Sequence, residues 1–141
     1  MRSICRSSVS FPIRDRLGTM VTPLPRRRII KLARETVTLD RLSNGRLTLG
    51  LGMGGDRGRE LSAFGEPTDA RLRAQILDEG PTLLTALWAG KLIDHHGAIT
   101  VDNVRATPAP VQQPRIPIWF GTSRFSGAPS RELRASMEYS R

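Results

Sequence analysis

Two apolar stretches on either side of a helical pattern constrain the fold more than any other feature of this sequence. Residues 16–22 are mostly apolar or β-branched, and Pro23 closes the run because proline cannot donate a ladder hydrogen bond. Residues 47–52 alternate leucine with threonine or glycine and lead to Gly54 and Gly55. This pattern predicts two parallel strands joined by a helix, with both carboxyl ends at one edge of the sheet. Folds of this kind bind ligands outside that edge, so a ligand site is expected there.

The segment between the two strands is predicted to be helical. Its apolar residues recur at three- and four-residue spacing, and Asn44 with Gly45 supplies a left-handed stop. In residues 47–52 the leucines are expected to pack on the helices. The glycines on the other face have two interpretations: they leave room for a ligand beside the backbone, or they ease a tight bend.

A second helix is predicted over residues 69–88, with Thr68 or Asp69 as its cap. Gly80 and Pro81 lie inside it, so a kink or two abutting helices are expected. Residues 94–115 are polar and proline-rich and are interpreted as a long excursion. It leads to a third, buried strand over residues 116–121.

The length of 141 residues fits one domain with an ordinary core. It is too short for a closed eight-stranded (β/α) barrel, which typically needs about 250 residues. If these strands belong to such a barrel, the chain is therefore expected to be a piece of one.

The formal net charge of +9 does not predict a nucleic-acid-binding surface. Twenty of the 22 basic residues are arginine, and aromatic residues, on which bases could stack, make up only 5% of the chain. The only basic cluster is Arg26-Arg27-Arg28. It is interpreted as a solvated helix start, with a small basic binding module for an anionic partner as the alternative function.

Cys5 is the only cysteine, so no internal disulfide can form and nothing indicates an oxidising compartment. The sequence has no apolar run of membrane-spanning length and no apolar central stretch of a secretory signal. A cytoplasmic protein without membrane contact is expected.

Three short patterns could carry chemistry, and each has a plainer explanation. Gly50-x-Gly52-x-x-Gly55 matches the letters of a dinucleotide fingerprint, but that Rossmann-like alternative needs a helix directly afterwards, and residues 56–60 are charged. His95-His96 lacks further ligands at metal-site spacing, so no metal is expected and a solvated loop pair is favoured. Asp78-Glu79 would not face each other on a helix and is interpreted as surface charge.

Four segments lie in a fixed order along the chain: residues 17–27, 39–47, 64–65 and 114–119. They read Leu-Gly-Thr-Met-Val-Thr-Pro-Leu-Pro-Arg-Arg, Leu-Asp-Arg-Leu-Ser-Asn-Gly-Arg-Leu, Phe-Gly and Pro-Arg-Ile-Pro-Ile-Trp. In order and spacing they resemble the luciferase-like flavin-dependent monooxygenase family. The most specific part is Leu-Asp-x-Leu-Ser-x-Gly-Arg, which leads into the glycine-rich strand.

The resemblance implies an α/β fold, a partial (β/α)8 TIM barrel of roughly three parallel strands with intervening helices. It implies reduced flavin (FMN) or a deazaflavin as cofactor, and oxidation of a small organic substrate with O2. A flavin reductase and a second copy of the chain are the partners it suggests. In the family, the strand matching residues 17–22 carries a non-prolyl cis peptide behind the flavin ring, which by position joins Met20 and Val21. One side of the flavin would then be lined by Thr19, Met20, Val21, Gly52, Met53 and Gly54.

The chain also departs from the family pattern. Deazaflavin-binding members tend to have Thr-Gly-Glu and a later Asn after the second strand, whereas this chain has Met53-Gly54-Gly55-Asp56, which favours FMN. Residues 1–14 do not match the first two barrel strands, which carry catalytic polar residues in the family, and residues 123–141 do not match the family's next segment. We therefore expect a partial barrel over residues 15–122, assign no catalytic residue, and expect weak or no flavin binding and association through open strand edges.

Overall fold

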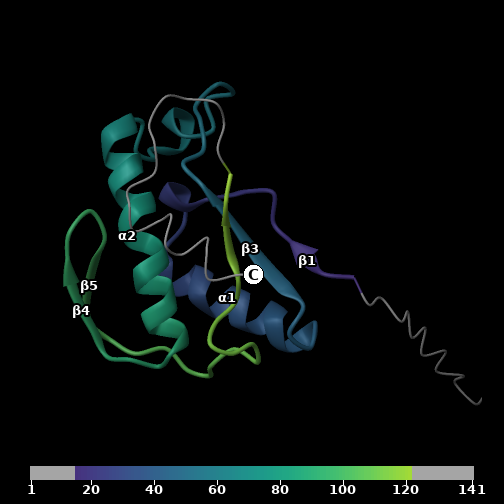
Figure 1. The fold of residues 1–141 in the computed structure, drawn as a ribbon. Coiled ribbons are helices and arrows are strands. Elements are labelled where there is room, and N and C mark those ends of the chain that lie inside the picture. The colour runs from purple at the N-terminus through teal and green to yellow at the C-terminus, as the bar shows by residue number, and fades with distance from the viewer. Residues whose placement is uncertain (1–14, 122–141) are drawn as a thin grey trace, which may run out of the picture.

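Strand β3 (Leu47–Gly52) is the centre of the sheet, and all six of its residues are buried. The computed structural model describes residues 15–121. Strands β1 (Leu17–Gly18) and β2 (Thr22–Pro23) pair with one edge of β3, and β6 (Ile118–Phe120) pairs with the other edge. All three pairings are parallel, so the predicted sheet of three parallel strands in chain order is confirmed (Figure 1).

The first predicted strand is divided by a break at residues 19–21. Its two ends, β1 and β2, follow the same edge of β3, with Leu17 opposite Leu47 and Thr22 opposite Leu51. The peptide bond between Met20 and Val21 is cis, as the family resemblance implied.

Thr19 bridges this break with its side chain. The Thr19 hydroxyl donates to the carbonyl oxygen of Gly50 at 3.0 Å and accepts from the N–H of Gly50 at 2.9 Å. Where strand geometry is interrupted, the contacts with β3 are therefore made by this side chain together with the backbone N–H of Thr19, which donates to the carbonyl oxygen of Thr48 at 3.4 Å.

Both helices lie where the sequence predicted them. Helix α1 covers Ile29–Leu42, and α2 covers Ala70–Trp88 with the Asp69 carboxylate accepting from the N–H of Leu72 at 2.7 Å. Helix α2 continues through Pro81, so the two abutting helices are not formed. Two short 3-10 helices, η1 (Leu24–Arg26) and η2 (Ser62–Phe64), precede α1 and α2.

The core lies between the sheet and the two helices. Leu47, Leu49 and Leu51 are at most 2% exposed, which confirms that the leucines of β3 face inward. The helices and the neighbouring strand supply the apolar side chains packed against them, among them Leu32, Val37, Leu84, Leu87, Trp88 and Ile118. Burial of this apolar area is the main contribution that favours the fold.

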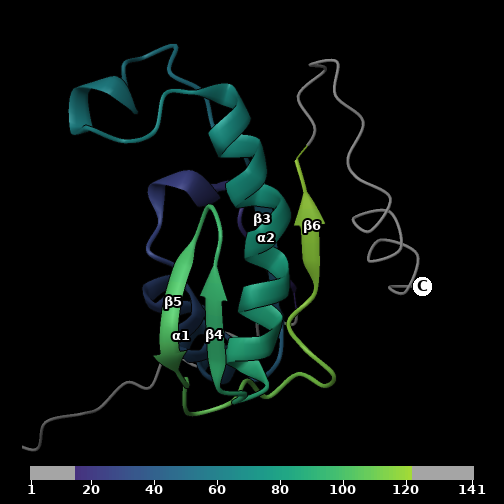
Figure 2. The same ribbon diagram turned by 90° about the vertical axis from the view of Figure 1, so that its left-hand side faces the viewer.

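The expected long excursion contains an antiparallel hairpin that the sequence did not predict. Strands β4 (Ile93–His96) and β5 (Thr100–Val104) form it, and it lies on the side of α2 away from β3 (Figures 1 and 2). Ile93 and Val101 join the core from this hairpin. The last strand is also shorter than predicted, because only Ile118–Phe120 of residues 116–121 is strand.

The motif over residues 39–46 stabilises the end of the sheet opposite the expected ligand site. Asp40 is fully buried, and its carboxylate accepts from the backbone N–H groups of Val111 and Gln112 and from the Gln112 side chain. The Gln112 amide also donates to the carbonyl oxygen of Leu47, the first residue of β3. Asn44 and Gly45 have positive φ, which confirms the left-handed stop.

The predictions for residues 1–14 and 123–141 lie outside the described residues. The proposed boundaries of the partial barrel, residues 15–122, stay a prediction. Within residues 15–121, none of the helices is long and apolar enough to cross a membrane.

Candidate functional site

The segment Thr19–Val21 lies directly against the glycine face of β3. A Cβ atom at Gly50 would collide with the carbonyl oxygen of Thr19, and one at Gly52 would lie 2.9 Å from a methyl carbon of Val21. The glycines are therefore needed for this segment of the chain itself. This packing is a reason for the glycines that is additional to the two interpretations given by the sequence, a ligand beside the backbone and a tight bend.

Met20 and Val21 form an exposed apolar surface at the break. Met20 is 96% exposed and Val21 is 38% exposed. Strand alternation puts Gly52 on the face of β3 opposite the leucines, so Val21 lies on the face away from the helices. The structure thus brings together Thr19, Val21 and Gly52 of the six predicted site residues, with Met20 beside them.

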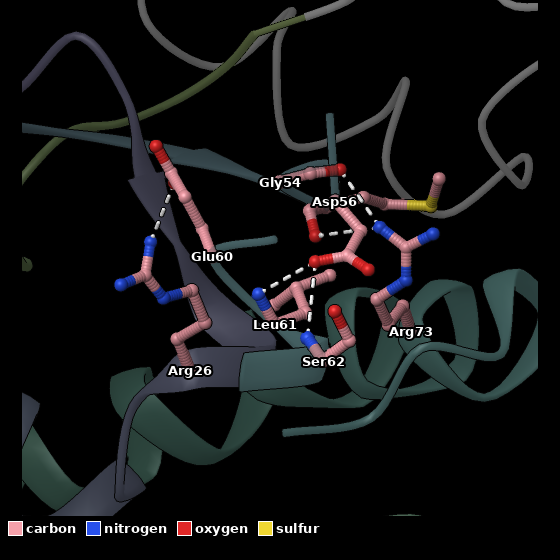
Figure 3. Close-up of polar contacts among 8 residues, drawn as sticks. Arg26, Gly54, Asp56, Glu60, Leu61, Ser62 and Arg73 are labelled. Atoms are coloured by element: carbon pink, nitrogen blue, oxygen red, sulfur yellow. Dashed lines mark hydrogen bonds and ion pairs between the residues drawn. The ribbon is translucent and has the colours of Figure 1, made fainter. Parts of the chain in front are cut away.

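The other two predicted residues, Met53 and Gly54, form the turn after β3. Gly54 has φ of +68°, and a Cβ atom there would lie 2.9 Å from Cβ of Pro23 in β2, so glycine suits both the backbone conformation and the space. On the other side of the turn, Arg73 of α2 donates from Nη1 to the carbonyl oxygen of Gly54 at 2.8 Å and, more weakly, to that of Met53 at 3.5 Å (Figure 3).

The next loop along the chain is ordered by Asp56. Its carboxylate accepts from the backbone N–H groups of Leu61 at 2.8 Å and Ser62 at 3.0 Å (Figure 3). The N–H of Ser62, then that of Leu61, holds the pKa of Asp56 below its ordinary value, because both stabilise the charged form. An ion pair of 2.8 Å between Arg26 and Glu60 joins the same loop to η1.

The structure of residues 53–61 and the pairing of Arg26 concern the two alternative functions, a dinucleotide-binding fragment and a small basic binding module. The first α-helix after the glycine pattern begins at Ala70, so the helix that a dinucleotide fingerprint requires directly afterwards is absent from residues 53–61. In the basic cluster, Arg26 is paired with Glu60, which leaves Arg27 and Arg28 as its exposed members.

His95 and Glu79 were interpreted as solvated, and the structure corrects both. His95 lies on β4, with Nε2 3.0 Å from the Glu79 carboxylate, which also accepts from the N–H groups of Ala98 and Ile99 at 3.1 Å each. Partial burial raises the pKa of Glu79, but the hydrogen bonds from His95, Ala98 and Ile99 lower it by more. Glu79 therefore fastens the hairpin turn to α2.

His96 points the other way. Its Nε2 lies 3.2 Å from the carboxylate of Asp94 and 3.5 Å from that of Asp102. These three side chains are close enough to share an ion, but all are exposed, which is common for acidic groups that bind none. Contacts of the His96 ring with these two carboxylates within the hairpin account for the group.

A cleft of about 230 Å³ lies elsewhere, between α1 and residues 106–108. It is lined by Ala33, Arg34, Val37, Thr38, Arg41, Ala106, Thr107 and Pro108, none of which is a predicted site residue.

Arg73 is the residue at this site that the sequence analysis missed. It is 9% exposed and is the only arginine among the buried residues of the described chain. A signal was available, because Arg73 falls at helical spacing with Ile76, Leu77 and Gly80, on the apolar stripe of the helix. An arginine in that stripe predicts a buried guanidinium with backbone partners.

Known proteins share the sequence pattern and the fold of this chain. A family model described as luciferase-like monooxygenase matches residues 14–129. Among solved structures, the chain is similar to monooxygenase RslO1 from Streptomyces bottropensis, with a TM-score of 0.64 and 28% identity. That match covers 74% of this chain and 31% of the monooxygenase.

Two more distant structures show the same fold. The F420-dependent tetrahydromethanopterin reductase from Methanopyrus kandleri has a TM-score of 0.63 and 20% identity over 76% of this chain and 34% of the reductase. Riboflavin lyase RcaE, solved with modified FMN and riboflavin, has a TM-score of 0.63 and 21% identity over 88% of this chain and 36% of the lyase. The chain thus spans about a third of the length of each of these proteins.

Proposed function

Because this chain belongs to the luciferase-like monooxygenase family, we propose that it contributes one wall of a flavin site in an oxidoreductase. The cofactor would lie at the carboxyl ends of β2 and β3. One observation carries the proposal: Val21 of the break lies against Gly52, the last residue of β3 and the one directly before the turn at Met53–Gly54, although the break and the turn are far apart in the sequence. Parallel α/β folds bind ligands outside the carboxyl ends of their strands.

The residues present fit a flavin-type ring. The exposed side chains of Met20 and Val21 offer an apolar surface, and the glycine turn beside them keeps the backbone accessible, with Gly54 exposed. Flat cofactors bind to surfaces of this composition, apolar with a few polar backbone groups. We assign Thr19, Met20, Val21, Gly52, Met53 and Gly54 to the cofactor wall and assign no catalytic residue.

We propose FMN as the cofactor and a deazaflavin as the alternative. The family resemblance supports a flavin-type cofactor, and two similar structures are described with modified FMN and with coenzyme F420. Met53-Gly54-Gly55-Asp56 in place of the deazaflavin pattern favours FMN. When bound, a reduced flavin would supply two electrons to O2, so that one oxygen atom enters an organic substrate and the other leaves as water. A flavin reductase and a cytoplasmic location complete the proposal.

Titration of the purified chain with FMN and, separately, with F420 tests this function. Fluorescence and absorbance report binding, and size-exclusion chromatography reports the species that binds. We expect weak, saturable binding, tighter for FMN than for F420, because one wall of a barrel supplies only part of the contacts.

The double variant Met20→Ser with Val21→Ser removes the apolar surface and tests the assigned wall against the wild type. Loss of saturation in this variant supports the assigned wall. Equal affinity of the variant and the wild type for FMN would contradict it. Binding of an anionic polymer that weakens steeply with salt, without flavin binding, would instead favour the basic binding module.

A further inference from the structure

Arg73 holds a position that the stability of α2 does not explain. Its guanidinium is buried on the apolar stripe of the helix, and within residues 15–121 no carboxylate forms an ion pair with it. Its Nε is buried and has no hydrogen-bond partner among the described residues. An unpaired buried donor lowers stability, and helix propensity would be served equally by a methionine or leucine at this position.

The contacts of Arg73 are with the turn after β3. Nη1 donates to the carbonyl oxygen of Gly54 at 2.8 Å, and the carbonyl oxygen of Met53 lies 3.5 Å away (Figure 3). These residues are also two of the six in the proposed cofactor wall. The guanidinium therefore acts on the turn through its backbone.

This contact fixes the direction of a neighbouring donor. The peptide bond between Gly54 and Gly55 is trans, because the cis bonds of the described chain lie elsewhere. In a trans peptide the N–H points opposite to the carbonyl of the same unit. With the Gly54 carbonyl drawn toward Arg73, the N–H of Gly55 is turned away from α2.

The Met53–Gly54 turn has contacts with two other elements. Pro23 of β2 lies on one side, where a Cβ atom at Gly54 would meet its ring at 2.9 Å, and Arg73 of α2 lies on the other. A glycine turn without such contacts has access to many backbone conformations. A ligand that binds a disordered turn must also order it, which weakens binding.

We propose that Arg73 is a positioning residue, which holds the Met53–Gly54 turn in the conformation that the cofactor binds. That the turn binds the cofactor rests on the proposed function. That Arg73 holds the turn rests on the contacts of Arg73. Arg73 acts through the carbonyl oxygens of Met53 and Gly54 and keeps the N–H of Gly55 directed outward.

The test compares Arg73→Met and Arg73→Lys with the control Arg71→Met. Arg71 is exposed and lies two residues earlier on the same helix, so its variant removes an equal charge without touching the turn. Backbone NMR order parameters of residues 53–56 in the chain without cofactor measure the order of the turn. FMN affinity, measured on the same samples, shows whether that order matters for binding.

In Arg73→Met we expect the order parameters of residues 53–56 to fall from about 0.85 to below about 0.6, with β3 and α1 unchanged. FMN binding should weaken by about tenfold, the loss typical of one charged hydrogen bond. Arg73→Lys keeps a cation that can reach one carbonyl, so it should restore part of both. Arg71→Met should match the wild type in both.

Three results would overturn the proposal. Unchanged order parameters in Arg73→Met would show that Arg73 does not hold the turn. Lower order parameters with unchanged FMN affinity would show that the turn is not part of the cofactor wall. Equal losses in Arg73→Met and Arg71→Met would point to net charge as the cause.

Two further outcomes can be distinguished from failure of the inference about Arg73. If the wild type binds neither FMN nor F420, the proposed function fails for this chain, and the order parameters of residues 53–56 decide whether Arg73 orders the turn. If circular dichroism shows that Arg73→Met is unfolded, Arg73→Lys carries the same two comparisons against Arg71→Met.

Discussion

The buried carboxylate of Asp40 on α1 accepts a hydrogen bond of 2.7 Å from the side-chain amide of Gln112, a residue 72 positions later in the chain. The same carboxylate accepts from two backbone N–H groups of residues 111 and 112. Because Gln112 also donates to Leu47, this contact joins α1, the start of β3 and the segment before β6. It holds the sheet at the end opposite the proposed cofactor wall.

Replacing Asp40 with alanine should lower the free energy of unfolding by about 3 kcal/mol, because three donors lose their buried acceptor. Urea unfolding monitored by circular dichroism measures the change. The control is Asp78→Ala, an exposed position on α2, which should stay within about 0.5 kcal/mol of the wild type. Equal stability of the two variants would show that Asp40 does not hold this segment.

The hairpin should loosen from α2 in acid. The contacts of Glu79 lower its folded-state pKa beneath the ordinary 4.5, so they stabilise the docked hairpin above that pH, and the stabilisation is lost as pH falls through the lowered value. Amide exchange of residues 98 and 99 at decreasing pH, corrected for intrinsic rates, measures this. In Glu79→Gln the protection of these amides should no longer depend on acid, whereas Asp78→Asn should keep the wild-type dependence. A wild-type pH profile in both variants would argue against the role of Glu79.

A single methyl group at Gly50 should destabilise the chain more than one at Gly55. The new Cβ at Gly50 would meet the carbonyl of Thr19, which is backbone and cannot move aside cheaply, whereas the space around Gly55 is open. We expect Gly50→Ala to cost about 3 kcal/mol and Gly55→Ala about 0.5 kcal/mol or less. Denaturant midpoints compare the two variants, and similar midpoints would mean that residues 19–21 do not lie against β3.

Flavin binding should quench one tryptophan selectively. Trp119 is 63% exposed and opposite Gly50 in the register of β6 with β3, while Trp88 is 2% exposed and its indole N–H donates to Thr36. Addition of FMN should therefore reduce the emission of Trp119 and spare that of Trp88. Trp119→Phe should abolish most of the quenching. Quenching that persists in this variant would place FMN away from β6.

The elements that could be predicted from sequence are those whose periodicity is strong. Helix α1 and helix α2 have apolar stripes, and β3 alternates leucine with smaller residues, so their positions follow from spacing alone. The hairpin could not be predicted in the same way, because β4 reads Ile-Asp-His-His and shows no alternation. Its docking depends on Glu79, a contact between segments that periodicity does not report.

The residues of the candidate site also differ in how far they could be predicted from the sequence. The six residues of the proposed wall could be named from the family resemblance. The structure gives a physical reason for the two glycines among them: Val21 approaches Gly52 closely, and Gly54 has a positive φ and lies against Pro23. Arg73 could be recognised only by its place in the apolar stripe of the helix, since its partners are backbone carbonyls that any sequence offers.

The bridge between Thr19 and Gly50 also has a consequence for protein engineering. Hydrogen bonds between backbone groups survive most substitutions, because every residue except proline carries the same amide. At Thr19, one hydroxyl serves as both a strand donor and a strand acceptor. One side chain therefore decides the strength of this connection between the strands. Serine at position 19 would keep both hydrogen bonds, and valine would remove them with nearly the same shape. Substitution of this one residue would thus adjust the flexibility of the adjoining Met20–Val21 segment without redesign of the fold.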